Sequence, residues 1–209
     1  MIHIESYVLL KEFQTNTYLV WDDVSQVALL IDPSAPSKAT AQLIIDKKLH
    51  LKMVINTHGH GDHIAGNNFF ADRFACPIAI HPLDAQMLTD NKKNMSLYMG
   101  YDIKLKGADV LLNDADELTL GKHIVRIIHT PGHTAGCICL LIDKYLVSGD
   151  TLFEQSIGRT DFPGGSHSAI IKSIKEKLFC LPDDVLVFPG HGPTTSIGLE
   201  KANNPFVRL

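Results

Sequence analysis

Apolar residues along the chain fall into short, closely spaced runs that are typical of β-strands. These strand-like runs cover residues 4–10, 17–21, 27–31, 52–56, 118–130, 137–142, 145–148 and 185–188. The first three runs predict a meander at the start of the chain. The run 52–56 extends this set, and the four remaining runs all follow residue 117. The sequence therefore predicts two sets of strands, one in each half of the chain.

Three segments instead carry apolar residues at the spacing of a helix, namely 37–48, 66–75 and 168–179. In the first of them the apolar positions are Ala41, Ile44, Ile45 and Leu49, and Ser37 can cap the helix by accepting a backbone N–H hydrogen bond. Together with the two sets of strands, these outer helices predict an α/β fold.

The chain has 209 residues and shows no low-complexity tract, linker or change of composition along its length. This length lies within the range of a single large domain and allows a substantial core to be buried. We therefore expect one domain over residues 1–209. Each half repeats strands, then a loop with potential metal ligands, then a helix, although the two halves share little sequence.

Composition narrows the class of protein. Hydrophobic residues make up 45% and charged residues 20% of the chain, as is ordinary for a soluble globular protein. The net charge of −4 offers no electrostatic attraction to nucleic acid or anionic lipid, so we expect neither as a partner. The N-terminus lacks a basic segment followed by an apolar core, and no window resembles a membrane span.

The four cysteines do not have the spacing of a disulfide framework, and we expect a cytoplasmic protein. Cys137 and Cys139 follow His133 closely, which raises the alternative that they bind a metal. Their segment is apolar and predicts a buried strand, so we favour a structural role as small core residues.

The most distinctive polar segment is 57–63, which places three imidazoles and one carboxylate within six positions. Glycines alternate with the potential ligands and let the backbone bend so that the donor atoms converge. His58, His60 and His63 offer nitrogen and Asp62 offers oxygen, a set that suits zinc or iron. The alternative is a histidine-rich surface loop that binds nothing.

Three later loops each place another potential ligand after an apolar run. These ligands are His133, Asp150 and His191, each a few residues beyond the end of its run. Donors at the ends of successive strands gather along one edge of a sheet, where the active sites of α/β folds generally lie. The four loops together therefore predict one shared metal site.

The ligand loops, in this order, resemble those of the metallo-β-lactamase superfamily of metal-dependent hydrolases: His58-x-His60-x-Asp62-His63, then His133, Asp150 and His191. Asp32 matches the family's first loop. The resemblance runs from about residue 16 to the C-terminus and implies a four-layer αββα sandwich with the metal site at one edge of the two sheets. Segments 149–153 and 189–193 are similar to the glyoxalase II-like branch, especially its short bacterial members.

The resemblance also implies how seven side chains share two divalent metal ions. The first ion is held by His58, His60 and His133, the second by Asp62, His63 and His191, and Asp150 bridges both. We expect zinc, with iron or manganese as alternatives. Water bound to a zinc ion with an open position has a pKa of about 7, which supplies hydroxide at neutral pH. Asp62 would orient this nucleophile or handle its proton.

Two residues near the ligands have two interpretations each. Asp32 either orients a ligand imidazole through its far ring nitrogen, as the resemblance implies, or is a turn residue before Pro33. His129, four residues before His133, either supports a ligand or only caps the loop, and we favour the cap.

Two segments are candidates for contact with a substrate. Segment 90–107 is the least regular part of the chain and carries two methionines and two tyrosines. It predicts either a mobile lid over an apolar substrate group or, as we favour, a surface excursion with its own apolar patch. Arg159 either clamps a substrate carboxylate or forms an internal salt bridge with Asp161. About eighteen residues follow His191, too few for the helical domain of glutathione-specific members, so we expect low specificity for glutathione.

The leading functional interpretation is a hydrolase that cleaves a small-molecule acyl thioester, such as S-lactoylglutathione, with a hydroxide between the two ions. The second is a mononuclear iron persulfide dioxygenase, which the similarity of segment 158–162 to that branch keeps open and which would use His58, His133 and Asp150. The third is a metal-storing or scaffold protein. Soluble β-lactamases of this fold often carry cysteine at the position of Asp150, which argues against antibiotic hydrolysis.

Overall fold

Two six-stranded sheets form the centre of the computed structural model, which describes residues 1–208. The first sheet has the order β1 (Ile2–Leu10), β2 (Thr15–Asp22), β3 (Val27–Ile31), β4 (His50–Ile55), β5 (Ile78–Ile80) and β6 (Val110–Leu111). β1, β2 and β3 are antiparallel neighbours, whereas β3, β4, β5 and β6 run parallel. The parallel strands therefore end at the same edge of this sheet.

The second sheet has the order β14 (Thr195–Ser196), β13 (Leu186–Pro189), β10 (Tyr145–Gly149), β9 (Ile138–Ile142), β8 (His123–His129) and β7 (Glu117–Leu120). Its neighbours are antiparallel except for β10 and β13, which run parallel. A small ribbon of β11 (Leu152–Phe153) and β12 (Ser156–Ile157) follows β10.

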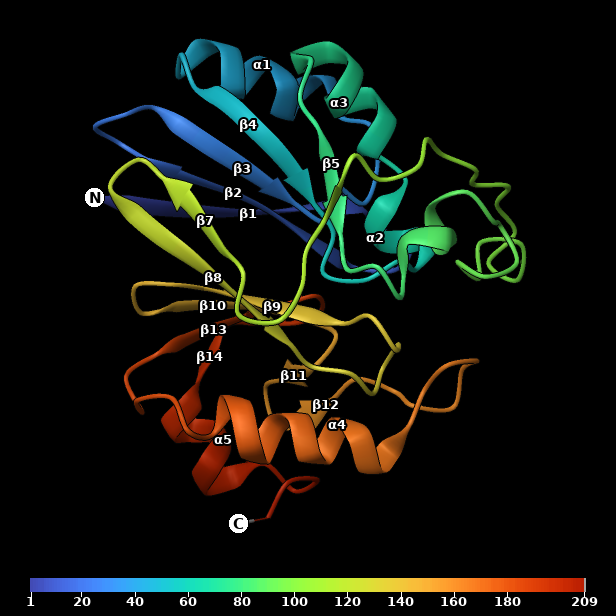
Figure 1. Ribbon diagram of the computed structural model, residues 1–209, viewed down its shortest axis with the longest axis vertical. Helices are drawn as coiled ribbons and strands as arrows, with labels where there is room; N and C mark the ends of the chain where they lie inside the picture. Colours follow the sequence, from blue (N-terminus) through green and yellow to red (C-terminus); the bar gives the residue numbers. More distant parts are fainter. Residues whose placement is uncertain (209) are drawn as a thin grey trace.

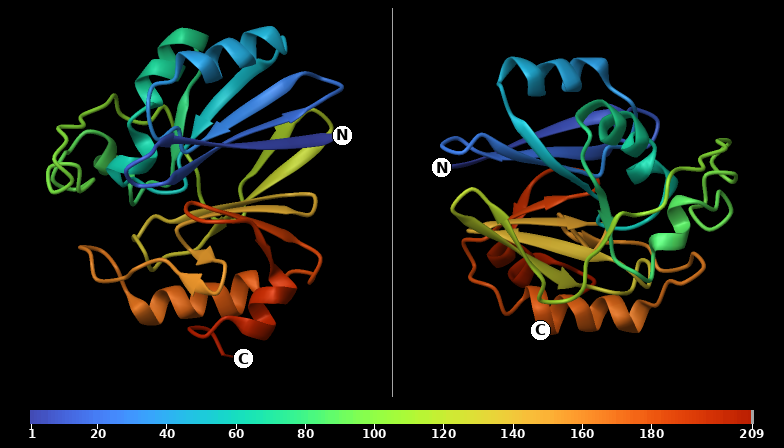
Figure 2. Two further views of the ribbon diagram at one scale, coloured as in Figure 1. Left: turned by 180° about the vertical axis from the view of Figure 1, so that it is seen from behind. Right: turned by 45° about the horizontal axis from the view of Figure 1, so that its top comes forward.

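Helices cover the outer face of each sheet, so the layers follow the order helix, sheet, sheet, helix (Figure 1). The helices of the first half are α1 (Lys38–Asp46), α2 (Gly61–Ile64) and α3 (Asn67–Phe74), and a short 3-10 turn spans Ala85–Leu88. Those of the second half are α4 (His167–Ser173), which continues as a π-helix over Ile174–Leu178, and α5 (Ile197–Asn203). The two further views show the same stacking (Figure 2). The αββα sandwich is thus confirmed.

The alternation of side chains along β2 explains this layering. Tyr18 and Val20 point into the core between the two sheets, whereas Leu19 and Trp21 pack under the helices of the first half. Successive side chains of a strand point to opposite faces, so a strand that is apolar at every position must be covered on both sides. A third cluster, around Ile170 and Val187, joins the second sheet to α4.

Several predicted elements differ in detail from the structure. Ile45 was assigned to the apolar face of α1 but is 44% exposed, whereas Ala41 and Ile44 are fully buried. The predicted helix 168–179 is α-helical only to Ser173 and then widens to a π-helix. Ser37 caps α1 as expected by accepting from the N–H of Thr40.

The sequence interpretation missed α2, α5 and the short strands β5, β6, β11, β12 and β14. These strands have two or three residues each, too few for an alternating pattern to be recognised. In α2, the ligand run itself winds into a single helical turn, which the alternation of glycine and polar residues did not indicate.

The buried-strand interpretation of the cysteines agrees with the structure. Cys139 lies within β9 and Cys137 just before it, and both are buried free thiols. Within residues 1–208, no helix is both long enough and apolar enough to span a membrane.

Candidate metal centre

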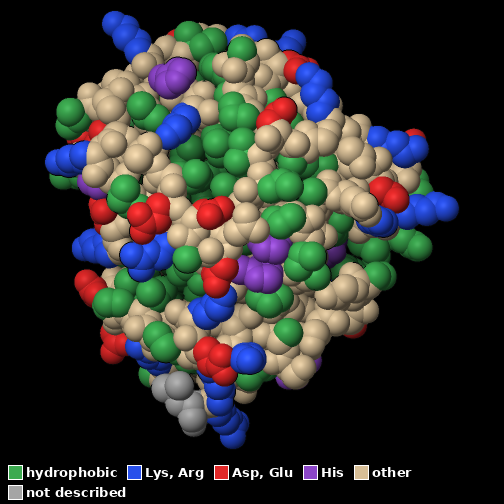
Figure 3. Space-filling view, viewed as in Figure 1, with side chains coloured by type: hydrophobic (Ala, Val, Ile, Leu, Met, Phe, Trp, Pro, Cys, Tyr) green, Lys and Arg blue, Asp and Glu red, His purple; other side chains and the backbone are tan. Residues whose placement is uncertain are grey.

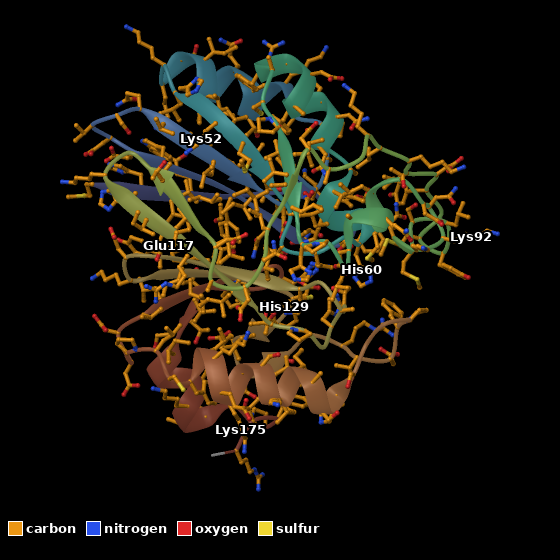
Figure 4. All side chains as sticks on the ribbon, viewed as in Figure 1. Lys52, His60, Lys92, Glu117, His129 and Lys175 are labelled. Atoms are coloured by element: carbon orange, nitrogen blue, oxygen red, sulfur yellow. The ribbon has the colours of Figure 1, made fainter. Side chains whose placement is uncertain are left out.

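The seven predicted ligands come together where the ends of strands from both sheets meet. His58 follows β4, and His60, Asp62 and His63 surround the start of α2. The other three ligands, His133, Asp150 and His191, follow β8, β10 and β13. Figure 4 places His60 at the junction of the two halves. The stacking of the sheets therefore assembles donors from four separate loops.

The first group of donors consists of three imidazoles. One ring nitrogen from each of His58, His60 and His133 lies within 4.8 Å of the others. His60 Nδ1 and His133 Nε2 are 2.9 Å apart. His58 Nε2 is buried and has no hydrogen-bond partner among residues 1–208. A buried polar atom without a partner is costly, and a metal ion held by the three converging nitrogens would satisfy His58 Nε2.

The second group consists of Asp62, His63 and His191. Asp62 Oδ2 lies 3.7 Å from His63 Nε2 and 3.5 Å from His191 Nε2, and the two Nε2 atoms are 3.3 Å apart. The mixed nitrogen and oxygen donors again suit a divalent ion of the zinc and iron class.

Asp150 lies between the two groups. Its Oδ2 is 3.4 Å from both His133 Nε2 and His191 Nε2, and its Oδ1 is 3.4 Å from His63 Nε2. Asp150 Oδ1 is buried and finds no hydrogen-bond partner in the part of the chain that the structure describes. The Asp150 carboxylate therefore faces nitrogens of both groups and keeps one oxygen unsatisfied.

The protonation states differ between the two groups. Burial holds the pKa of His60 at about 3 and that of His58 well below its usual value, so both imidazoles are neutral and available as ligands. Burial also lowers the pKa of His63 and His191, but the carboxylates of Asp150 and Asp62 outweigh it and raise these values to about 9 and about 11. An ion bound in the second group would displace those protons.

Hydrogen bonds on the far ring nitrogens hold the imidazoles in place. His133 Nδ1 donates to the carbonyl of Arg159 at 2.7 Å, and His191 Nδ1 donates to the carbonyl of Phe13 at 3.0 Å. These bonds set the tautomer, which leaves the Nε2 atom of each ring facing the centre.

Asp32 supports His63 in the same way. Its Oδ2 lies 3.0 Å from His63 Nδ1, and its Oδ1 accepts the backbone N–H of Thr57 at 2.7 Å. Asp32 also has a φ of 49°, the left-handed conformation typical of a turn. Both interpretations of Asp32 therefore apply. It is a turn residue, and the turn directs its carboxylate towards the imidazole of His63.

His129 is not part of the centre. Its ring stacks on His81 at 4.1 Å, and its Nε2 lies 2.9 Å from the carbonyl oxygen of Ala135. This is the loop cap that the sequence favoured. The space-filling view shows histidine side chains gathered at the junction of the two halves (Figure 3).

Asp84 is a functional candidate that the sequence did not reveal. It is 1% exposed and accepts three hydrogen bonds, from Gly59 N–H at 3.1 Å, Thr134 Oγ at 2.6 Å and Gly136 N–H at 2.8 Å. Gly59 belongs to the first ligand run, whereas Thr134 and Gly136 follow His133 in the other half. Asp84 therefore ties the His60 loop to the His133 loop, and no local pattern around residue 84 indicates this.

Replacement of Asp84 by Asn should loosen this tie, because the amide places a donor against groups that themselves donate. We expect Asp84→Asn to weaken metal binding by about 10- to 100-fold and to lower the free energy of unfolding by about 1–3 kcal/mol. Competition with a chromophoric chelator and urea unfolding measure the two effects. Asp72→Asn is the control, because Asp72 is exposed and forms only a surface ion pair with Lys106. Equal metal affinity in the two variants would contradict a positioning role for Asp84.

A cavity of about 600 Å³ opens at the metal centre. Besides the ligands, it is lined by Phe13, Met95, Tyr98, Met99, Phe153 and Phe162. Three of these side chains belong to segment 90–107, which borders the centre in Figure 4, where Lys92 marks it. The favoured interpretation of this segment as a surface excursion with its own apolar patch missed this placement, which arises because the packing of both halves brings three of its apolar side chains to the cavity.

Arg159 also lines this cavity, but its side chain is already paired. Its Nε and Nη2 donate to the two carboxylate oxygens of Asp161, each at 2.7 Å. The guanidinium carbon lies 3.8 Å from the ring centroid of Phe162. The internal salt bridge is therefore present, and a substrate carboxylate would have to compete with Asp161.

The stacked sheets and the paired donor groups at their common edge define a metal-dependent enzyme of the αββα class. The family model of the "Metallo-beta-lactamase superfamily" matches residues 10–191, and the chain belongs to this superfamily.

Curated relatives extend over nearly the whole chain. An uncharacterized protein of Mycobacterium tuberculosis is 39% identical over 206 residues, covering 92% of both chains. The "Hydroxyacylglutathione hydrolase GloC" of Haemophilus influenzae is 36% identical over 203 residues, covering 93% of both.

Solved structures agree with this fold. The BLEG-1 B3 metallo-beta-lactamase is 34% identical with a TM-score of 0.93, covering 99% of this chain and 100% of that one. ETHE1 from Myxococcus xanthus is 30% identical with a TM-score of 0.81, covering 97% and 83%. TTHA1623, solved in a di-iron-bound form, is 29% identical with a TM-score of 0.85, covering 97% and 100%.

Proposed function

We propose that this protein is a binuclear metal-dependent hydrolase that cleaves acyl thioesters of the S-lactoylglutathione type. The observation that carries the proposal is the position of Asp150, within 3.4 Å of nitrogens from both donor groups. The hydroxyacylglutathione hydrolase among the relatives supports the reaction type. When bound, two divalent ions, for which we propose zinc, would acidify water and polarise the scissile carbonyl.

The chain's own residues would orient the reactants. Asp62 Oδ2 accepts a hydrogen bond from Thr15 Oγ at 3.1 Å, which fixes the carboxylate at the cavity wall, where it can orient the attacking water. Water adds to the acyl carbon, the carbon–sulfur bond breaks, and a carboxylic acid and a thiol are released. A thiolate is a good leaving group, so this reaction needs no dedicated acid among the cavity residues.

The decisive experiment compares His60→Ala with His50→Ala. His60 belongs to the first donor group, whereas His50 is exposed at the opposite end of β4. We expect metal-loaded His60→Ala to lose at least about 100-fold in kcat/KM on S-lactoylglutathione, because one ligand of the first ion is missing. His50→Ala should match the unmodified protein. Equal rates in all three proteins would contradict the proposal.

A second candidate is a mononuclear iron persulfide dioxygenase. The likeness to ETHE1 supports it, and His58, His133 and Asp150 would form the two-histidine, one-carboxylate site it needs. The complete second group of Asp62, His63 and His191 favours two ions instead. Metal counting together with oxygen uptake on glutathione persulfide separates the candidates. One iron per chain with oxygen consumption would reverse our ranking.

Antibiotic hydrolysis is tested in the same series. The residue type at position 150 argued against it, but a protein named a B3 metallo-beta-lactamase is 34% identical to this chain. A β-lactam substrate therefore belongs beside the thioesters in the assay. We retain a small-molecule acyl thioester as the proposed substrate, with no nucleic acid or membrane partner.

A further inference from the structure

A second, smaller cavity adjoins the metal centre on the far side of Asp62. It measures about 210 Å³ and is lined by Leu10, Ala35, Pro36, Ala65, Met99 and Ile103. Asp62 and Met99 line both this cavity and the larger one. The two cavities are therefore neighbours, and the side chains of Asp62 and Met99 form part of the wall that separates them.

The wall of the smaller cavity presents no polar surface, although Ser34, Asp62 and Tyr101 are among its lining residues. The Ser34 hydroxyl lies 3.2 Å from Thr17 Oγ, and the Ser34 N–H donates to the same oxygen at 3.1 Å. Asp62 Oδ2 accepts from Thr15. A polar ligand group placed here would lose its water without gaining a partner, whereas an alkyl group would lose nothing.

The larger cavity offers few charges to a thiol carrier. Apart from the predicted metal ligands, Arg159 is the one charged side chain among the described residues that line it, and Asp161 already pairs with it. Aromatic and methionine side chains form most of the remaining wall. Selectivity for the substrate must therefore come from apolar contacts. The smaller cavity, beside the acyl side of the substrate, offers the more enclosed apolar contacts.

We propose that the substrate's acyl group is a short, unbranched alkyl chain that passes Met99 and fills the smaller cavity. Because the two cavities share the flexible Met99 side chain, an acyl chain bonded to the scissile carbonyl would enter the smaller one when that side chain turns aside. Its volume is roughly seven times the share of one water molecule in the liquid, which fits an acyl group of roughly four to six carbons. The proposal rests on the thioester hydrolase function and refines its substrate class.

The test measures kcat/KM of the metal-loaded protein for acetyl, butyryl and hexanoyl thioesters of N-acetylcysteamine. Each methylene transferred into the cavity should raise kcat/KM about fourfold, so butyryl should exceed acetyl by about 15-fold. Binding of the matching S-(2-oxoalkyl) thioethers, which cannot be hydrolysed, is measured by titration calorimetry. Their affinities should rise with chain length in the same order.

Three variants locate the effect. Ala65→Leu fills the cavity and should reduce the hexanoyl-to-acetyl ratio of kcat/KM at least about tenfold. Ile103→Ala enlarges it and should move the preference to longer chains. Ala202→Leu is the matched control, because Ala202 is exposed on α5 in the other half. The ratio within one variant cancels any general loss of folded or metal-loaded protein.

The outcomes separate this proposal from the proposed function. Hydrolysis with a ratio that is flat, or that Ala65→Leu leaves unchanged, would overturn the alkyl cavity and leave the hydrolase standing. Thioethers that bind more tightly with chain length, with no thioester hydrolysed, would support the cavity and overturn the hydrolase. A ratio and an affinity that both rise with chain length and fall in Ala65→Leu would support both.

Discussion

Asp150→Asn should abolish most of the activity while preserving the shape of the side chain. Asp150 is the residue that contacts nitrogens of both donor groups, and its Oδ1 has no other partner. An amide lacks the negative charge needed to hold two cations close together. We expect kcat/KM on the thioester to fall at least about a thousandfold, which is about 4 kcal/mol, and the metal content to fall below two ions per chain.

Asp143→Asn is the matched control for this variant. Asp143 precedes β10 and Asp150 follows it, so the two residues lie at opposite ends of one strand. Asp143 has a φ of 51°, which asparagine adopts readily, and it pairs at the surface with His123. Its replacement should leave kcat/KM and metal content unchanged. If Asp150→Asn kept two ions and activity within about tenfold of the control, a bridging role would be excluded.

Removal of bound metal ions should have the second-largest effect, which is a lower stability of the folded protein. His60 Nδ1 and His133 Nε2 lie 2.9 Å apart, and among residues 1–208 the buried His58 Nε2 and Asp150 Oδ1 have no hydrogen-bond partner, so these donors depend on a cation to satisfy them. Free metal at a thousand times its dissociation constant stabilises the folded state by about 4 kcal/mol. For a chain of this length we expect chelation to lower the Tm by roughly 10 °C.

Differential scanning calorimetry before chelation, after chelation and after metal is restored measures this shift. Asp150→Asn provides the comparison, because a protein that already lacks part of its metal should show a smaller change. Elemental analysis must accompany each scan. A Tm that stays constant after the ions are shown to be gone would mean that the donor groups are stable by themselves and do not need metal for their packing.

The convergence of the candidate ligands could be predicted from sequence because most of them follow a local rule. His58, His133, Asp150 and His191 each stand just after an apolar strand, and the ends of neighbouring strands meet at a sheet edge. The strands themselves were recognisable wherever they were long. Strands of two or three residues, such as β5 and β14, carry too few positions for a period to be detected.

Contacts between the two halves followed no local rule. Asp84 binds Gly59 and Thr134, which lie 25 positions before it and 50 after it. Met99 reaches both cavities only because segment 90–107 folds back over α2. Such contacts depend on how the two sheets stack. The spacing of residues along the chain does not predict that stacking.

The sequence by itself determined the donor types, their order and the strands that carry them, because these depend on residue identity and on periods of a few positions. Only the tertiary structure decided which oxygen or nitrogen faces which, that Arg159 is already paired with Asp161, and that an apolar cavity adjoins Asp62. Those properties arise from packing between segments far apart in the chain, where distances of a few ångströms decide whether a group is free, paired or buried.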